Sequence, residues 1–192
     1  MQPIFTIHAG EYLVGSHIEQ NLTNKAGEKF NVWVPSKDTG VDLLITNLQN
    51  TKTASVQVKF SKDFLVTHGR PEYQHKLISC GWWTLNREKI GVFVADFWIF
   101  ALHTFNEKNM QYVVIRPAEL KKRLDILHPN EKPIQTYLWV TKGAIQKCWE
   151  TRGLRKTDTD AIVDDNYDKP DLENRDFTEF LNNWEPMIKK LT

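Results

Sequence analysis

The first 61 residues show hydrophobic and polar patterns that predict one helix followed by three strands. Apolar residues three or four positions apart predict an amphipathic helix over residues 9–23. Residues 28–35 are predicted to form a strand that ends at Pro35. Strict alternation over residues 54–61 predicts a half-buried strand, which we expect to form a hairpin with the apolar run at 41–47.

The rest of the chain continues to alternate between helical and extended patterns. The predicted segments are a helix at 74–89, a strand pair at 92–102 and 112–117, a helix at 117–127, a strand at 134–141, an irregular acidic connection at 157–175 and a terminal helix at 176–191 interrupted at Pro186. This order indicates a mixed α/β fold. We expect one α/β domain over residues 1–156, with the acidic connection and C-terminal helix of residues 157–192 packed on it.

One face of the predicted hairpin carries polar side chains that a generic hairpin does not need. Apolar and polar residues alternate along its second strand, so Gln57 and Lys59 are expected to point away from the core. If the hairpin is centred just after Asn50, Asp42 lies opposite Lys59 and Leu44 lies opposite Gln57. Asp42, Gln57 and Lys59 would then share one face of the hairpin.

A second carboxylate, that of Glu11, heads the apolar stripe of the first predicted helix. At 100° per residue, Val14, Ile18 and Leu22 fall on nearly the same side of the helix as Glu11. A carboxylate that faces a core is costly unless a metal ion or a lysine compensates its charge. The alternative is that Glu11 lies in the first helical turn, where it is solvated and favoured by the helix dipole.

Asp42, Gln57, Lys59 and Glu11 together supply the groups that a metal-dependent phosphodiesterase needs. Carboxylate and amide oxygens are hard ligands that can hold Mg²⁺, and the bound ion can engage a scissile phosphate and acidify a water molecule. A nearby ammonium can orient that water and offset the negative charge that develops during the reaction.

The order of these residues resembles the PD-(D/E)xK nuclease superfamily, in which a helix carries a glutamate, an aspartate opens a hairpin strand, and acid-x-Lys follows on the next strand. The match covers residues 9–61. Its segments GEYLVGSHIEQN, DTGVDLLI and QVKFSK look like the small prokaryotic nuclease-like domains that carry Gln-x-Lys. The resemblance implies a restriction-endonuclease-like α/β fold with a central mixed β-sheet flanked by helices.

The resemblance also implies an activity, that of a Mg²⁺-dependent DNA endonuclease in which a metal-activated water hydrolyses the phosphodiester bond. Mn²⁺ would be able to substitute for Mg²⁺. Asp42 would be the central metal ligand, Gln57 an auxiliary ligand, and Glu11 a further partner of the metal or of a lysine. Lys59 would orient the attacking water.

Two positions depart from the superfamily pattern. Val41 stands where the motif has proline, and Gln57 replaces the acid, so one negative charge is missing from the metal site. The alternative function is therefore a catalytically degenerate nuclease-fold domain that acts as a nucleic-acid or protein interaction module. A third, weaker interpretation is a scaffold whose polar hairpin is only solvated. Lys62 and His68, just past the motif, are candidate DNA contacts or, alternatively, a solvated lysine and a surface histidine.

Charge and composition limit the classes of partner. Residues 158–176 hold eight acidic and two basic residues, which leaves 23 basic and 16 acidic residues elsewhere. The part of the chain outside residues 158–176 therefore carries a basic excess that could bind a polyanion such as DNA. The alternative is an ordinary charged surface beside a solvated acidic loop. Cys80 and Cys148 lack metal-site spacing and are predicted to be reduced. Without a leader or an apolar run of about 18 residues, we expect a cytoplasmic protein with no membrane contact. Many compact nucleases work as dimers to cut both strands, so the resemblance also allows a homodimer.

Overall fold

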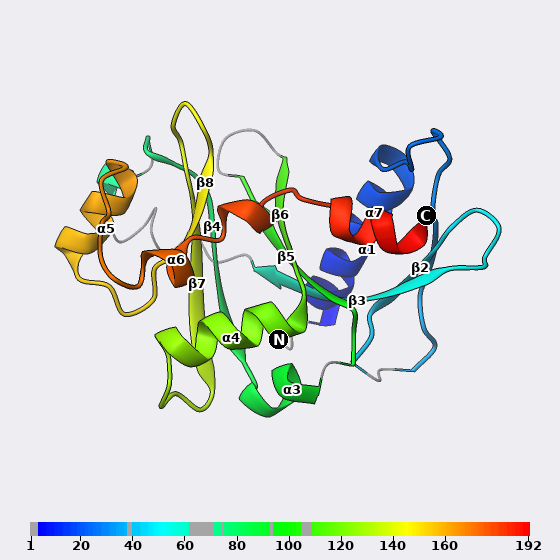
Figure 1. Ribbon diagram of the computed structural model, residues 1–192, viewed down its shortest axis with the longest axis horizontal. Coiled ribbons are helices and arrows are strands. Elements are labelled where there is room, and N and C mark those ends of the chain that lie inside the picture. Colours follow the sequence, from blue (N-terminus) through cyan, green and yellow to red (C-terminus); the bar gives the residue numbers. More distant parts are fainter. Residues whose placement is uncertain (1–3, 38–39, 62–70, 74, 93, 105–108) are drawn as a thin grey trace.

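The strands form two sheets in the computed structural model, which describes residues 4–37, 40–61, 71–73, 75–92, 94–104 and 109–192 (Figure 1). The larger sheet has the order β1-β2-β3-β5-β6 and the smaller one the order β4-β7-β8. Their bounds are β1 (Asn31–Trp33), β2 (Leu43–Thr46), β3 (Thr53–Ser61), β4 (Leu77–Leu85), β5 (Phe97–His103), β6 (Met110–Ile115), β7 (Ile134–Thr141) and β8 (Lys147–Glu150).

Helices flank the larger sheet and extend beyond the smaller one. They are α1 (Ile4–Asn21), α3 (Arg87–Val92), α4 (Pro117–Leu127), α5 (Lys156–Val163), α6 (Leu172–Arg175) and α7 (Glu185–Leu191), with short 3₁₀ turns at η1 (Pro71–Tyr73) and η2 (Thr178–Phe180). Figure 1 shows α1 and α7 at one end of the molecule and α5 and α6 at the other. None of the helices in the described ranges is long and apolar enough to cross a membrane.

The larger sheet is mixed and has a hydrophobic core on each face. Strands β3 and β5 are parallel, whereas the β1–β2, β2–β3 and β5–β6 pairs are antiparallel. On one face, α1 and α7 pack in a common cluster with Val56 and Val58 of β3. On the other, Trp98 and Phe100 of β5 pack with side chains of α4, β4 and β7. The predicted α/β class with a mixed central sheet flanked by helices is confirmed.

Most of the predicted elements are present, although several are shorter than expected. Helix α1 covers most of the predicted helix at 9–23, and β2 and β3 lie within or close to the predicted hairpin strands. Helix α4 and strand β7 have the predicted bounds, 117–127 and 134–141. Strand β8 was not predicted, because its four residues are too few to show a period.

The predicted helix at 74–89 is wrong, because this segment forms β4 and the start of α3. Strand β4 pairs with β7 from Leu77 to Leu85, so tertiary pairing overrides the local helical pattern. Gly81 lies against the indole of Trp83, and a Cβ at position 81 would overlap that ring. The glycine therefore serves a close packing contact within a strand.

The acidic segment is more regular than predicted. Instead of an irregular connection it contains α5 and α6, and its acids pair with lysines of the smaller sheet and its flank: Asp164 with Lys76 and Asp165 with Lys147, each at 2.5 Å. The terminal helix is also shorter than predicted. Pro186 lies in the first turn of α7, not in a helix interior. In the first turn the missing N–H of proline costs nothing, because that N–H would have no partner within the helix.

The segment 157–192 contributes to both cores of the larger sheet. Met187 of α7 is fully buried in the cluster with α1 and β3, and Phe177 is fully buried in the cluster with α4 and β5. The expected boundary between residues 156 and 157 stays a prediction.

Candidate functional site

The β2–β3 hairpin brings Asp42 next to the Gln-x-Lys segment. Its register pairs Leu44 with Ser55, so the predicted pairing of Leu44 with Gln57 and of Asp42 with Lys59 is wrong by two positions. The cause lies in the turn, where the side-chain oxygen of Asn47 accepts hydrogen bonds from two backbone N–H groups and Asn50 adopts a φ of 55°. These contacts centre the turn one residue earlier than expected.

Asp42 lies where the regular pairing of β2 with β3 ends. The backbone N–H of Asp42 donates to the Val56 carbonyl at 2.8 Å, and Leu43 is also paired with Val56, so one residue faces two as in a β-bulge. The Asp42 carboxylate then accepts a hydrogen bond from the Val58 N–H, with an Oδ2 to N distance of 2.7 Å. Val58 stands between Gln57 and Lys59. The carboxylate is therefore fixed to the backbone of the Gln-x-Lys segment itself.

Gln57 and Lys59 lie on the polar face of β3, as predicted. Both side chains are half-buried, whereas Val56 and Val58 point into the core with α1. On the adjacent parallel strand, Trp98 is the register partner of Gln57. The Lys59 Nζ lies 5.0 Å from the centre of the Trp98 ring. The lysine thus has an aromatic surface on one side.

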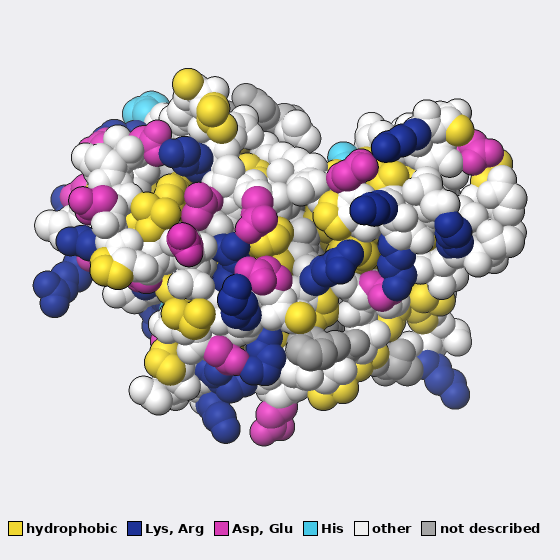
Figure 2. Space-filling model, viewed as in Figure 1, with side chains coloured by type: hydrophobic (Ala, Val, Ile, Leu, Met, Phe, Trp, Pro, Cys, Tyr) yellow, Lys and Arg dark blue, Asp and Glu magenta, His cyan; other side chains and the backbone are white. Residues whose placement is uncertain are grey.

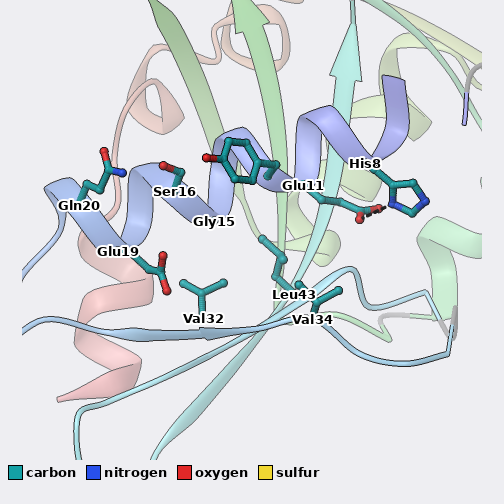
Figure 3. Close-up of a pocket in the computed structure, with 10 residues that line it drawn as sticks. His8, Glu11, Gly15, Ser16, Glu19, Gln20, Val32, Val34 and Leu43 are labelled. Atoms are coloured by element: carbon teal, nitrogen blue, oxygen red, sulfur yellow. Dashed lines mark hydrogen bonds and ion pairs between the residues drawn. The ribbon is translucent and has the colours of Figure 1, made fainter. Parts of the chain in front are cut away.

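Glu11 does not lie on the same side of the sheet as Gln57 and Lys59. Helix α1 covers the face of the sheet that carries Val56 and Val58, which is opposite to that of Gln57 and Lys59. The Glu11 carboxylate is 3.1 Å from the His8 Nδ1 (Figure 3) and its side chain is only 15% exposed. Because α1 begins at Ile4, Glu11 does not lie in the first turn, so the alternative interpretation, a dipole-stabilised position there, is wrong.

Glu11 instead lines a groove between α1 and the edge of the larger sheet, with a volume of about 420 Å³ (Figure 3). The described residues that line it are His8, Glu11, Tyr12, Gly15, Ser16, Glu19, Gln20, Val32, Val34 and Leu43. Asp42, Gln57 and Lys59 are not in this set. The predicted role of Glu11 as a partner of the metal or of Lys59 therefore has no contact to support it among the described residues.

The donor set for a metal ion is small. Among the residues that the structure describes, no group of three His, Cys, Asp or Glu side chains could hold a metal. Mg²⁺ commonly needs only one or two carboxylates, because it keeps several waters and binds substrate phosphates. The hard oxygens of Asp42 and Gln57 fit that pattern. Lys62 and His68, the candidate DNA contacts, lie outside the described residues.

The chain matches no family model, no curated protein and no solved structure. The site must therefore be judged by its own geometry.

The surface charge is mixed. Figure 2 shows Lys and Arg side chains interspersed with Asp and Glu on the face that it displays. Lys76 and Lys147 of the main body are paired with acids of the segment 158–176, so part of the basic excess counted from the sequence is neutralised within the molecule.

Sequence reasoning missed Trp98 as a member of the site. It lies in the strongly apolar run 92–102 and is a core residue at 3% exposure, and its ring also borders the Lys59 ammonium. Its place beside Gln57 and Lys59 depends on the parallel pairing of β5 with β3, which joins residues about forty positions apart. No local periodicity carries that information.

Proposed function

We propose that this protein is a metal-dependent DNA endonuclease of the restriction-endonuclease-like class. The observation that carries the proposal is the hydrogen bond from the Val58 N–H to the Asp42 carboxylate, 2.7 Å long, which joins the aspartate to the Gln-x-Lys segment. A carboxylate, an amide and an ammonium on two adjoining strands are the groups that phosphodiester hydrolysis requires.

The order of elements supports the same proposal. Helix α1 precedes an antiparallel series of three strands, β1 to β3. The chain then passes through β4 of the smaller sheet and through α3 before it reaches β5, which lies parallel to β3. The proposed fold places the aspartate at the start of the second strand and the Gln-x-Lys segment on the third. In support of the proposal, Asp42 directly precedes β2 and Lys59 lies on β3.

Each side chain has a proposed task. Asp42 and Gln57 would hold Mg²⁺ through their oxygens, and Mn²⁺ would serve in its place. A bound divalent ion supplies Lewis acidity at the phosphate and acidifies a coordinated water. Lys59 would donate hydrogen bonds to the attacking water and to a phosphate oxygen, and its positive charge would offset the charge that builds up there. DNA is the proposed substrate.

The rival function is an interaction module that retains the fold without turnover. Gln57 favours it, because a neutral amide in place of a carboxylate leaves the metal site with one negative charge fewer. The two functions differ in one observable, which is cleavage of bound DNA.

The test is a cleavage assay on supercoiled plasmid and linear duplex DNA, with Mg²⁺, Mn²⁺ or a chelator. The matched variant is Asp42→Asn, which removes the charge while its amide oxygen can still accept the hydrogen bond from Val58. We expect the wild type to cut only with a metal, and Asp42→Asn to lose at least about a hundredfold in rate, since metal assistance is worth several kcal/mol. A wild type that binds DNA but stays inert with both metals would establish the interaction module. Cleavage that persists in chelator would exclude the metal mechanism.

A further inference from the structure

We infer that Trp98 is a positioning residue that holds the Lys59 ammonium at the reacting phosphate. The inference rests on the proposed nuclease function and adds a residue that the Gln-x-Lys pattern does not contain. Its basis is the position of the Lys59 Nζ over the Trp98 ring, 5.0 Å from the ring centre.

The indole is suited to this task because it is itself fixed. Trp98 is 3% exposed, and its ring is 6.3 Å from that of Phe100 in the core between the larger sheet, α4 and the smaller sheet. Lysine has a flexible four-carbon stem with large rotamer entropy, so an ammonium in open solvent is poorly placed. A buried ring beside it restricts the positions that the ammonium can take.

The attraction is electrostatic and specific to an aromatic face. The face of an indole carries partial negative charge and attracts a cation within about 6 Å of its centre, more strongly the further the pair is desolvated. Because the ring carries no net charge, this contact does not neutralise the positive charge of the lysine.

The geometry also links the lysine to the metal ligand. Trp98 is the register partner of Gln57 across the parallel β3–β5 pair, and Lys59 is two residues further along the same face of β3. One ring therefore borders both side chains of the Gln-x-Lys segment. A change at position 98 should act on turnover through Lys59 more than on the binding of DNA.

The first experiment compares steady-state cleavage by the wild type and three variants, Trp98→Leu, Trp98→Phe and Trp83→Leu. Trp83 is a matched control because it is buried in the same cluster but belongs to the smaller sheet. We expect Trp98→Leu to lower kcat about tenfold with KM within about twofold, as loss of a cation–π contact predicts. Trp98→Phe, which keeps an aromatic face, should recover most of kcat. Trp83→Leu should lower the melting temperature but leave kcat nearly unchanged below it.

The second experiment does not depend on activity or on a folded Trp98 variant. In the wild type, the NMR signals of the Lys59 side-chain methylene groups, identified by their loss in Lys59→Ala, should be shifted upfield by the ring current of the indole. Signals at ordinary lysine positions would overturn the inference. So would equal kcat values for the wild type and Trp98→Leu, or equal losses in Trp98→Leu and Trp98→Phe. A wild type that does not cut DNA overturns the proposed function and the positioning role together, whereas an active wild type that is insensitive at Trp98 overturns the positioning role alone.

Discussion

At the scale of single residues, the Asp42 carboxylate has a structural task as well as the proposed chemical one. It accepts the Val58 N–H at the end of the regular β2–β3 pairing. We predict that Asp42→Ala lowers the free energy of unfolding by about 1–3 kcal/mol, because it leaves a partly buried N–H without its acceptor. Asp42→Asn should lose less than about 1 kcal/mol, since an amide oxygen replaces the carboxylate oxygen. Urea denaturation of both variants measures the difference, and equal stabilities would show that this hydrogen bond does not matter.

Gln57 offers a second test at this scale. Gln57→Glu introduces the acid of the motif that this segment resembles, and places a second carboxylate near the Asp42–Val58 hydrogen bond. Without metal, like charges should lower the melting temperature, whereas with Mg²⁺ a more negative site should bind the ion more tightly and raise it. The measurement is the Mg²⁺-induced change in melting temperature for the wild type and Gln57→Glu. The control is Gln135→Glu on β7, which should show no added response to Mg²⁺. An unchanged response in Gln57→Glu would exclude position 57 as a metal ligand.

At the scale of elements, the approach of α1 to β3 sets the position of the strand that carries Gln57 and Lys59. A Cβ at Gly10 would overlap the Cβ of Phe60, whereas a Cβ at Gly15 would lie 3.3 Å from a methyl group of Val32. We predict that Gly10→Ala destabilises the fold by about 1–3 kcal/mol through overpacking. Gly15→Ala should be close to neutral, because the better helix propensity of alanine offsets a mild contact. Thermal or urea unfolding compares the two, and a Gly10→Ala variant as stable as Gly15→Ala would contradict the packing of α1 on β3.

The elements that local patterns predicted well are those with local boundary signals. Helix α4 begins at Pro117, whose ring suits the first helical turn, and β3 shows a strict alternation that ends near its last residue. The closeness of Asp42 to Gln57 and Lys59 was predictable for the same reason, because a hairpin needs only local pairing. Its register was not, because the Asn47 side chain sets the turn.

Features that depend on distant segments were not predictable from the pattern. The segment 74–89 has helical spacing, but its residues 77–85 pair with β7, about fifty to sixty residues later. Whether Glu11 would reach the site depended on which face of the sheet α1 covers. The contact of Trp98 with Lys59 depended on the parallel pairing of β5 with β3. Each of these features is set by contacts between distant segments, which the periodicity of the sequence does not encode.

At the scale of the whole molecule, Asp96 joins the C-terminal helix to the larger sheet. Its carboxylate accepts hydrogen bonds from the Ser55 N–H and hydroxyl at 2.9 and 3.0 Å and lies 2.5 Å from the Lys190 Nζ. Partial burial raises the pKa of Asp96, but the hydrogen bonds from Lys190 and Ser55 outweigh it and hold the pKa below its ordinary value. A depressed pKa stabilises the fold above the ordinary value of 3.8, and this contribution disappears as acid protonates the folded carboxylate.

We therefore predict that Asp96→Asn lowers the free energy of unfolding at neutral pH, and that the difference from the wild type shrinks as the pH falls below about 4. The pair is partly exposed, so the effect at neutral pH should be on the order of 1 kcal/mol or less. Urea denaturation across the acid range measures it, with the exposed Asp168→Asn as a control that should track the wild type. A difference that stays constant with pH would show that packing, rather than the charge, links α7 to the sheet.

Replacing one lysine is the most direct test of the site that we propose on the β2–β3 hairpin. Lys59→Ala removes the proposed ammonium from the polar face of β3, while Val56 and Val58 keep the core face intact. The matched control is Lys52→Ala, at the turn end of the same hairpin. The measurement is Mg²⁺-dependent cleavage of duplex DNA by both variants and the wild type, with melting temperatures recorded alongside. We predict that Lys59→Ala melts near the wild type and loses at least about a hundredfold in rate, whereas Lys52→Ala keeps it. Cleavage that survives in Lys59→Ala would show that the active site lies elsewhere.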